Sequence, residues 1–219
     1  MKRIIIIGFV FSLFGCSHTV LSTKSPAVNI YSSYGEKMKG PVALVIEYDL
    51  RATNQEIKPS PSTHICSAHS YEITAGDDLA FSIKTTTDAM FEQVVEEIAL
   101  PTKDEMHEKD IQGTIYVRLN RFYPTISFSR GVWETNGMAS CDIVLDVIIT
   151  DSENKDLLVT AVEGTKVAEG GRVHASCHGG ADILSKAISQ GIRETMERYA
   201  ESVSKSDKIR KAFAVKRKD

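Results

Sequence analysis

The sequence lacks a strong excess of charge of either sign. Its 219 residues hold 26 lysines and arginines against 29 aspartates and glutamates, which gives a formal net charge of −3. A nearly neutral chain gives no electrostatic signal for a polyanionic partner, so we expect no nucleic-acid binding. The chain also lacks low-complexity blocks and internal repeats. Its 42% hydrophobic and 25% charged residues are the composition of an ordinary globular protein.

Motifs for hydrolases and nucleotide-binding enzymes are also absent. The chain has no GxSxG, phosphate-loop or dinucleotide-binding sequence. Adjacent carboxylates such as Asp77 and Asp78 would point about 100° apart on a helix and would not converge on one substrate. A Cys177 nucleophile paired with His174 or His178 would still need an orienting group and an oxyanion site. We therefore expect no enzymatic activity and no cofactor.

No apolar run is long enough to cross a membrane as a helix. The longest, residues 4–14, would span roughly 16 Å, about half of a bilayer core. It follows Lys2 and Arg3 and ends at Gly15. A basic start, a short apolar stretch and a small residue at its end are typical of a secretory signal peptide, residues 1–15. The alternative is a buried strand at the N-terminus.

The segment Leu13-Phe14-Gly15-Cys16 resembles the lipobox of bacterial lipoproteins. This resemblance implies cleavage before Cys16, a diacylglycerol thioether on its thiol and a third acyl chain on its new amino group. Two or more acyl chains hold a protein stably on a membrane, whereas a single chain does so only marginally. Ser17, where an aspartate would retain the protein at the inner membrane, implies an outer-membrane location facing the periplasm. Residues 16–40 are rich in Ser, Lys and Gly and are expected to form the lipidated tether.

Hydrophobic periodicity in residues 41–203 predicts a two-layer α/β (α+β) sandwich. We expect a mixed sheet of four or more strands with two amphipathic helices on one face. The strand at 41–50 is apolar on both sides and should be central. The expected strands are 41–50, 71–74, 113–124, 142–150 and 156–167, the helices are 77–99 and 181–203, and the main loops are 51–70, 102–110 and 168–180.

This order of elements resembles the amino-terminal α/β domain of TolB-like envelope proteins. The resemblance covers a first apolar strand, a helix that opens with "AGDDL" and ends in "MFEQVVEEI", the hairpin "DIVLDVIITDSENKDLLVTAV" and the last helix "ADILSKAISQGIRETM". It implies a non-enzymatic accessory or assembly factor for an envelope protein complex. The implied partners are the membrane, through the lipid, and envelope proteins, with homo-oligomer formation as a further option.

Three cysteines remain after Cys16, and an exported chain meets an oxidising environment in which disulfides form. The hairpin returns the chain close to Cys141, and Cys177 follows soon after, so Cys141–Cys177 is the easiest pair to close. The alternative is Cys66–Cys177, because both residues lie in loops that precede helices. One thiol stays unpaired in either case.

The remaining segments of interest are two His/Cys loops and a basic C-terminal tail. Cys and His side chains are zinc and copper ligands. A periplasmic ligand- or metal-binding module is therefore the alternative function, if the two loops meet in space. The tail, residues 204–219, is either a solvated extension or a contact with an anionic surface. The candidate metal ligands are His64, Cys66, His69, His174, Cys177 and His178.

Overall fold

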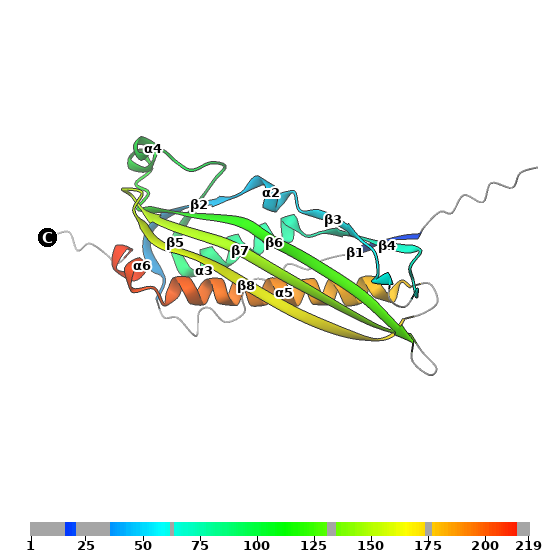
Figure 1. Ribbon diagram of the computed structural model, residues 1–219. Helices are drawn as coiled ribbons and strands as arrows, with labels where there is room; N and C mark the ends of the chain where they lie inside the picture. The colour runs from blue at the N-terminus through cyan, green and yellow to red at the C-terminus, as the bar shows by residue number, and fades with distance from the viewer. Residues whose placement is uncertain (1–15, 21–35, 62–63, 131–134, 174–176, 214–219) are drawn as a thin grey trace, which may run out of the picture.

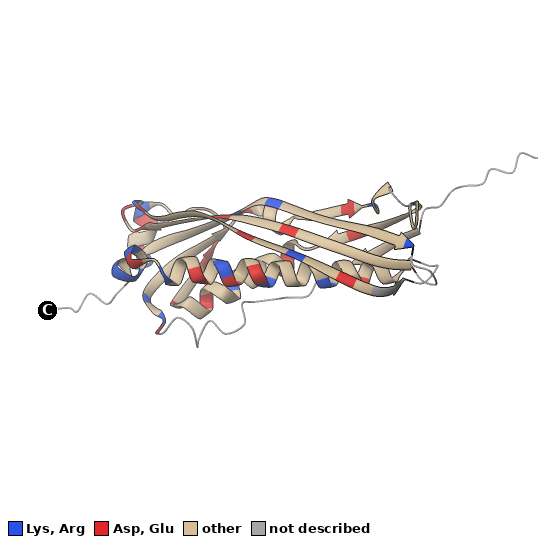
Figure 2. Ribbon diagram, turned by 60° about the horizontal axis from the view of Figure 1, so that its bottom comes forward, with Lys and Arg blue, Asp and Glu red and all other residues tan. Residues whose placement is uncertain are grey.

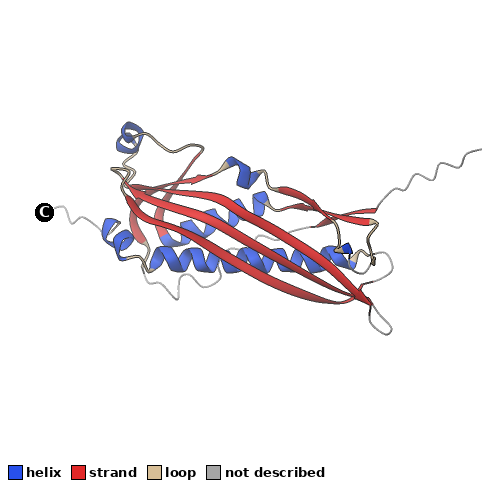
Figure 3. Ribbon diagram, in the orientation of Figure 1, coloured by secondary structure: helices blue, strands red, loops and turns tan. Residues whose placement is uncertain are grey.

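Long strands and two helices make up most of the molecule, in two layers (Figure 1). The computed structural model describes residues 16–20, 36–61, 64–130, 135–173 and 177–213. The predicted signal peptide therefore lies outside the described residues. A five-stranded mixed sheet carries the two long helices, residues 76–90 and 179–204, on one face. A three-stranded sheet lies beside it. This confirms the predicted α+β sandwich (Figure 3).

The main sheet has the strand order β5-β2-β6-β7-β8, and the smaller sheet has the order β1-β4-β3. Strand β2 runs parallel to both of its neighbours, whereas β6, β7 and β8 are antiparallel. The central position predicted for the first apolar strand is confirmed. The elements are β1 (Cys16–Val20), β2 (Met38–Ile46), α2 (Tyr48–Arg51), β3 (Asn54–Ile57), β4 (His69–Thr74), α3 (Gly76–Met90), β5 (Phe91–Glu97), α4 (Lys103–Glu108), β6 (Gly113–Arg130), β7 (Thr135–Asp151), β8 (Asp156–Val173), α5 (Gly179–Ser204) and α6 (Asp207–Ala212).

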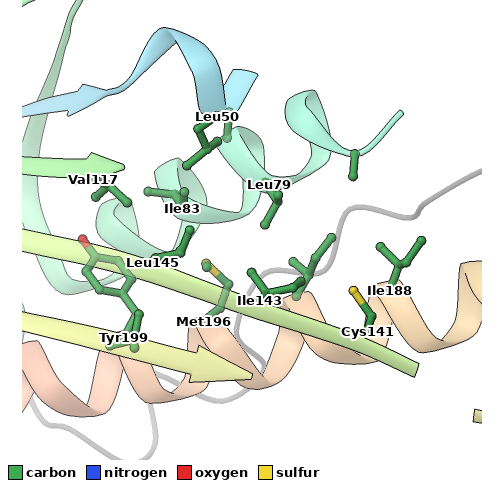
Figure 4. Close-up of a cluster of buried hydrophobic side chains, with 14 of the residues drawn as sticks. Leu50, Leu79, Ile83, Val117, Cys141, Ile143, Leu145, Ile188, Met196 and Tyr199 are labelled. Atoms are coloured by element: carbon green, nitrogen blue, oxygen red, sulfur yellow. The ribbon is translucent and has the colours of Figure 1, made fainter. Parts of the chain in front are cut away.

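The core lies between the helices and the inner face of the main sheet. Helix α5 contributes a continuous apolar stripe, and each of its large side chains is worth about 1.5–3 kcal/mol when fully buried. Thr87 Oγ1 and Tyr199 Oη form a buried 2.9 Å hydrogen bond that joins α3 to α5. Figure 4 shows the two helices and β7 meeting around Leu50, Leu79, Ile83, Ile143, Leu145, Ile188, Met196 and Tyr199.

The predicted hairpin is present, but its strands are longer than the sequence indicated. Strand β8 continues to Val173, although the glycines after Val167 favour a loop. Gly170 is needed for packing, because a Cβ there would come within 2.3 Å of Ile183 in α5. The glycine thus lets the start of the helix approach the strand, so the predicted loop 168–180 is strand over its first part.

The helix predicted at 77–99 ends at Met90, and the chain continues as strand β5. Val94 and Val95 of β5 pair with Val42 and Ala43 of β2, which gives that central strand its second parallel neighbour. Ile98, which a longer helix would have buried in its stripe, is fully exposed. The prediction of one long helix was therefore wrong, because pairing along the edge of β2 outweighs the local helical pattern.

Several short elements lie where the sequence predicted loops or a tail. Strand β3 lies within the expected loop 51–70, and α4 lies within the expected loop 102–110. Helix α4 begins with a capping box in which the Thr102 and Glu105 side chains satisfy each other's backbone N–H groups. The C-terminal segment forms helix α6, and Phe213 directly after it is 1% exposed and packs edge-on against Phe91 at 5.2 Å. Residues 214–219 of the predicted tail lie outside the described residues.

Candidate functional site

The residue predicted to carry the lipid opens strand β1 at one end of the molecule (Figure 1). Residues 16–20 pair in parallel with β4, with Cys16 beside His69. The Cys16 thiol is free and exposed, whereas Val20 is 1% exposed and reaches the core. The first residues of the predicted tether are therefore part of a sheet. The last ones open β2, and residues 21–35 lie outside the described residues.

The two His/Cys loops do meet, through a disulfide between Cys66 and Cys177. Their sulfurs lie 1.99 Å apart, and the bond joins residues 111 positions apart in the sequence. Both cysteines have left-handed backbone φ angles of 57° and 56°, which are unfavourable for residues other than glycine. The disulfide ties the loop before β4 to the start of α5.

The pairing ranked first from the sequence, Cys141 with Cys177, is not the one in the structure. Cys141 is a free, fully buried thiol on the inner face of β7, and burial raises its pKa to about 12. It packs against Gly191, in the middle of α5. Cys177 lies just before α5 begins, roughly 18 Å away along the helix axis. The hairpin brings the chain back near Cys141 but points that side chain into the helix layer.

Tyr71 of β4 connects the disulfide to the core. Its ring is fully buried, and its hydroxyl donates a 2.8 Å hydrogen bond to the carbonyl oxygen of Cys177. Burial raises the pKa of Tyr71 to about 12. A Cβ on Gly180 would come within 2.3 Å of the tyrosine hydroxyl, so the first turn of α5 can approach this ring only with glycine at that position.

Replacing Tyr71 with phenylalanine should lower the free energy of unfolding by about 1–3 kcal/mol. The change leaves the buried Cys177 carbonyl without its hydrogen-bond donor, which costs the desolvation of that group. Urea unfolding measures the effect. Tyr123→Phe is the matched control, since that side chain is 59% exposed and its substitution should change stability by less than about 0.5 kcal/mol. Equal effects of both substitutions would contradict the role of the hydrogen bond.

Three histidines surround this junction and form what we call the histidine cluster: His18, His69 and His178. The rings of His18 and His69 stack at 5.0 Å, and His18 Nε2 lies 2.8 Å from His69 Nδ1. The His178 ring meets the His18 ring edge-on at 5.6 Å. The pKa of His18 is lowered by burial and, to a lesser extent, by the charges of the two neighbouring histidines.

The histidine cluster differs from the metal-ligand set predicted from the sequence. Cys66 and Cys177 are bonded to each other, so neither offers a thiolate, and His174 lies outside the described residues. His64 is exposed, and it is not among the three clustered rings. Within the described ranges, no group of three or more His, Cys, Asp and Glu side chains is placed to hold a metal ion.

His18 was missed because its segment was assigned to the tether. The one local signal was the pair Thr19-Val20, whose β-branched side chains favour a strand. A strand of five residues whose partner is β4, about fifty residues later, leaves little trace in hydrophobic periodicity.

The outer face of the main sheet carries a network of opposite charges. Arg121 bridges Asp142 at 2.7 Å and Glu163 at 3.2 Å, so one guanidinium joins all three long strands. Arg118 pairs with Asp146 at 2.9 Å. These exposed pairs contribute little to stability. Charges of both signs also alternate along the exposed side of α5, where Arg198 pairs with Glu194 (Figure 2).

Exposed apolar side chains lie beyond this network, toward the end of the long strands, with Glu169 of β8 paired beside Met138 of β7. Tyr123, Met138 and Val167 are each about half exposed there, on the outer face of β6, β7 and β8. Next to them, β8 forms one edge of the main sheet within the described part of the chain. The outer face therefore combines a polar half with a more apolar half beside a strand edge.

Comparison with known proteins gives similarity only at the level of solved structures. No protein-family model matches the sequence. No curated protein sequence matches it. The chain is similar to a protein from Xanthomonas campestris assigned to the DUF330 family, at 10% identity and a TM-score of 0.41, over 84% of this chain and 97% of that one.

Two other solved structures are also similar. One is a minor lipoprotein from Acinetobacter baumannii, at 11% identity and a TM-score of 0.41, covering 77% of this chain and 93% of that one. The other is PelC from Paraburkholderia phytofirmans, solved as a dodecamer, at 15% identity and a TM-score of 0.31, covering 78% and 96%. Among the described residues, no helix is both long and apolar enough to cross a bilayer.

Proposed function

We propose that this protein is a non-enzymatic lipoprotein, anchored in the outer membrane through Cys16 and facing the periplasm. It acts there as an accessory or assembly factor for an envelope protein complex. The observation that carries the anchor is the position of Cys16. Its thiol is free and exposed, it opens the first described strand, and it directly follows the lipobox-like "LFG".

The pairing of β1 with β4 affects how such an anchor would hold the domain. Because Cys16 itself is paired beside His69, almost no chain separates the acyl groups from the folded domain. The lipid would thus fix one end of the molecule at the membrane surface and raise its local concentration near membrane-bound partners. The far end, with α4 and α6, would point into the periplasm (Figure 1).

Partner binding is proposed to use the outer face of the long strands. An edge strand of 18 residues such as β8 can accept a further strand from another protein. The neighbouring side chains Tyr123, Met138 and Val167 add exposed apolar area to the same surface. A second copy of the chain could use the same edge.

The anchor is tested by producing the full chain and its Cys16→Ala variant in a Gram-negative host. The unchanged chain should lose residues 1–15, gain the mass of its acyl chains and sediment with outer membranes. Cys16→Ala should carry no acyl chain and keep its signal peptide. Cys141→Ala, which removes a buried thiol, should be acylated normally. A Cys16→Ala chain that is still processed and still sediments with outer membranes would refute anchoring at this residue.

The accessory role is tested by photo-crosslinking in cells. A photoreactive residue at Val167, on the outer face of β8, should give discrete products with one or a few envelope proteins. The same residue at Lys186, on the exposed side of α5, is the control and should not give those products. Identical products from both positions would argue against the sheet face as the binding surface.

A further inference from the structure

The histidine cluster links the predicted lipid-bearing strand to the rest of the domain. Each ring comes from a different element. His18 lies in β1, His69 begins β4, and His178 is the N-cap residue of α5. Val20 is the only fully buried side chain of β1. Besides its backbone pairing with β4, the strand is therefore held mainly by Val20 and by the stacking of His18. Such a short element belongs to the least stable part of a fold.

The contact between His18 and His69 limits how many protons the pair can carry. Their nitrogens lie 2.8 Å apart, so one proton fits between them. Two neutral rings, or one neutral and one charged ring, can meet this condition. When both rings are charged, every ring nitrogen carries a proton, and two N–H groups would point at each other across 2.8 Å. The doubly charged pair must therefore separate.

The surroundings of the cluster do not compensate for positive charge. On β4, the Tyr71 ring stacks against His18 at 5.4 Å and is neutral. On α5, His178 lies at the positive end of the helix dipole, and Asp182 in the first turn is exposed. Glu72 of β4 accepts a hydrogen bond from Ser17 on the opposite side of the strand pair. Among the described residues, no hydrogen bond or ion pair joins a carboxylate to these three rings.

We propose that protonation of the histidine cluster releases β1 from β4 and lengthens the connection between the Cys16 lipid and the domain. This inference rests on the proposed function, because it concerns the strand that carries the anchor. Release frees the five residues of β1, which alone span up to about 17 Å when extended. The domain is held against the membrane at neutral pH and can reach farther from it at acidic pH.

The direction of the pH dependence follows from which state binds more protons. The docked state holds His18 with a lowered pKa, so the released strand binds protons more readily. Docking is therefore at full strength above the ordinary histidine pKa of about 6.5 and weakens progressively as the pH falls below it. The change therefore begins near pH 6.5 and continues as the pH falls through the lowered pKa of His18.

Hydrogen–deuterium exchange on the mature chain from the bacterial envelope tests this inference at pH 7.5 and pH 5.0. After correction for intrinsic exchange rates, the backbone amides of β1 should lose at least tenfold in protection at pH 5.0, while those of β7 should not change. His18→Phe keeps an aromatic ring against Tyr71 but cannot be protonated, so its β1 should stay protected at both pH values. His107→Gln, in α4 and outside the cluster, is the matched control and should behave like the unchanged chain.

Unchanged protection of β1 in the native chain, or equal loss in His18→Phe, would overturn the inference. If β1 of His18→Phe is not protected at pH 7.5, the same exchange measurement is made on His69→Gln. This substitution removes the second imidazole of the pair and keeps a hydrogen-bonding side chain, so its β1 should stay protected at both pH values. The intact mass of each sample shows whether Cys16 is acylated. A chain without acyl groups that still releases β1 contradicts the anchor alone, whereas an acylated chain with pH-independent protection contradicts the release alone.

Discussion

Replacing Cys66 and Cys177 together with alanine should lower the free energy of unfolding by about 4–5 kcal/mol. The disulfide joins residues 111 positions apart, so its removal frees a very long loop in the unfolded chain. Natural domains are stable by only about 5–15 kcal/mol, so the loss takes a large share of the total. Urea unfolding of the oxidised protein and of the double variant measures the difference.

Cys141→Ala is the control for the disulfide experiment and also tests the connectivity. Removing this buried thiol leaves the Cys66–Cys177 bond intact and should cost only about 1 kcal/mol through a small cavity. A non-reducing peptide map should show one linked peptide pair, containing Cys66 and Cys177. If Cys141→Ala destabilised the protein as much as the double variant does, the bond would have to involve Cys141.

Phe213→Ala should lower the free energy of unfolding by about 3–5 kcal/mol, although the residue lies near the end of a basic segment. Its ring is buried against Phe91, and its carbonyl oxygen accepts a 3.1 Å hydrogen bond from the Lys39 backbone. The substitution opens a cavity between β5 and the C-terminal helix. Thermal or urea unfolding measures the loss.

The neighbouring Lys211→Ala is the matched control, because that side chain is exposed and its loss should change stability by less than about 0.5 kcal/mol. A Phe213→Ala protein as stable as the unchanged chain would show that the C-terminal segment adds nothing to the core.

The parts of the fold that follow from local patterns could be predicted from the sequence. The hairpin of β7 and β8 alternates apolar and polar residues on either side of the turn "DSENKD". Helix α5 repeats apolar residues such as Leu184, Ile188 and Ile192 at helical spacing. Both elements bury one face against the other layer, so their periodicity reflects the fold directly.

Residues 91–97 show why other parts could not be predicted. Val94 and Val95 suit a helix stripe and a strand almost equally well. The choice depends on the open edge of β2, which lies about fifty residues earlier in the sequence and becomes visible only in three dimensions. The same limit applies to β3 and β1, which are short strands with partners in β4.

The candidate site was predicted only in outline. Sequence reasoning proposed that the loops around Cys66 and Cys177 could meet, and they do. The choice between Cys66 and Cys141 as the partner of Cys177 depended on which way the Cys141 side chain points from β7, and proximity along the hairpin does not determine that direction. His18 joined the cluster only because β1 crosses back onto β4.

The order of the cysteines along the chain has a consequence for biogenesis. If the chain is exported from its N-terminus and Cys16 is acylated, as proposed, Cys66 is the first of the three remaining cysteines to reach the oxidising compartment, Cys141 is the second and Cys177 is the last. The first thiol that Cys66 can meet is therefore the wrong one. Early formation of the β6–β7 pairing would withdraw Cys141 into the protein interior before it reacts. Otherwise a mispaired bond must be exchanged, and maturation then depends on an enzyme that reshuffles disulfides as well as one that forms them.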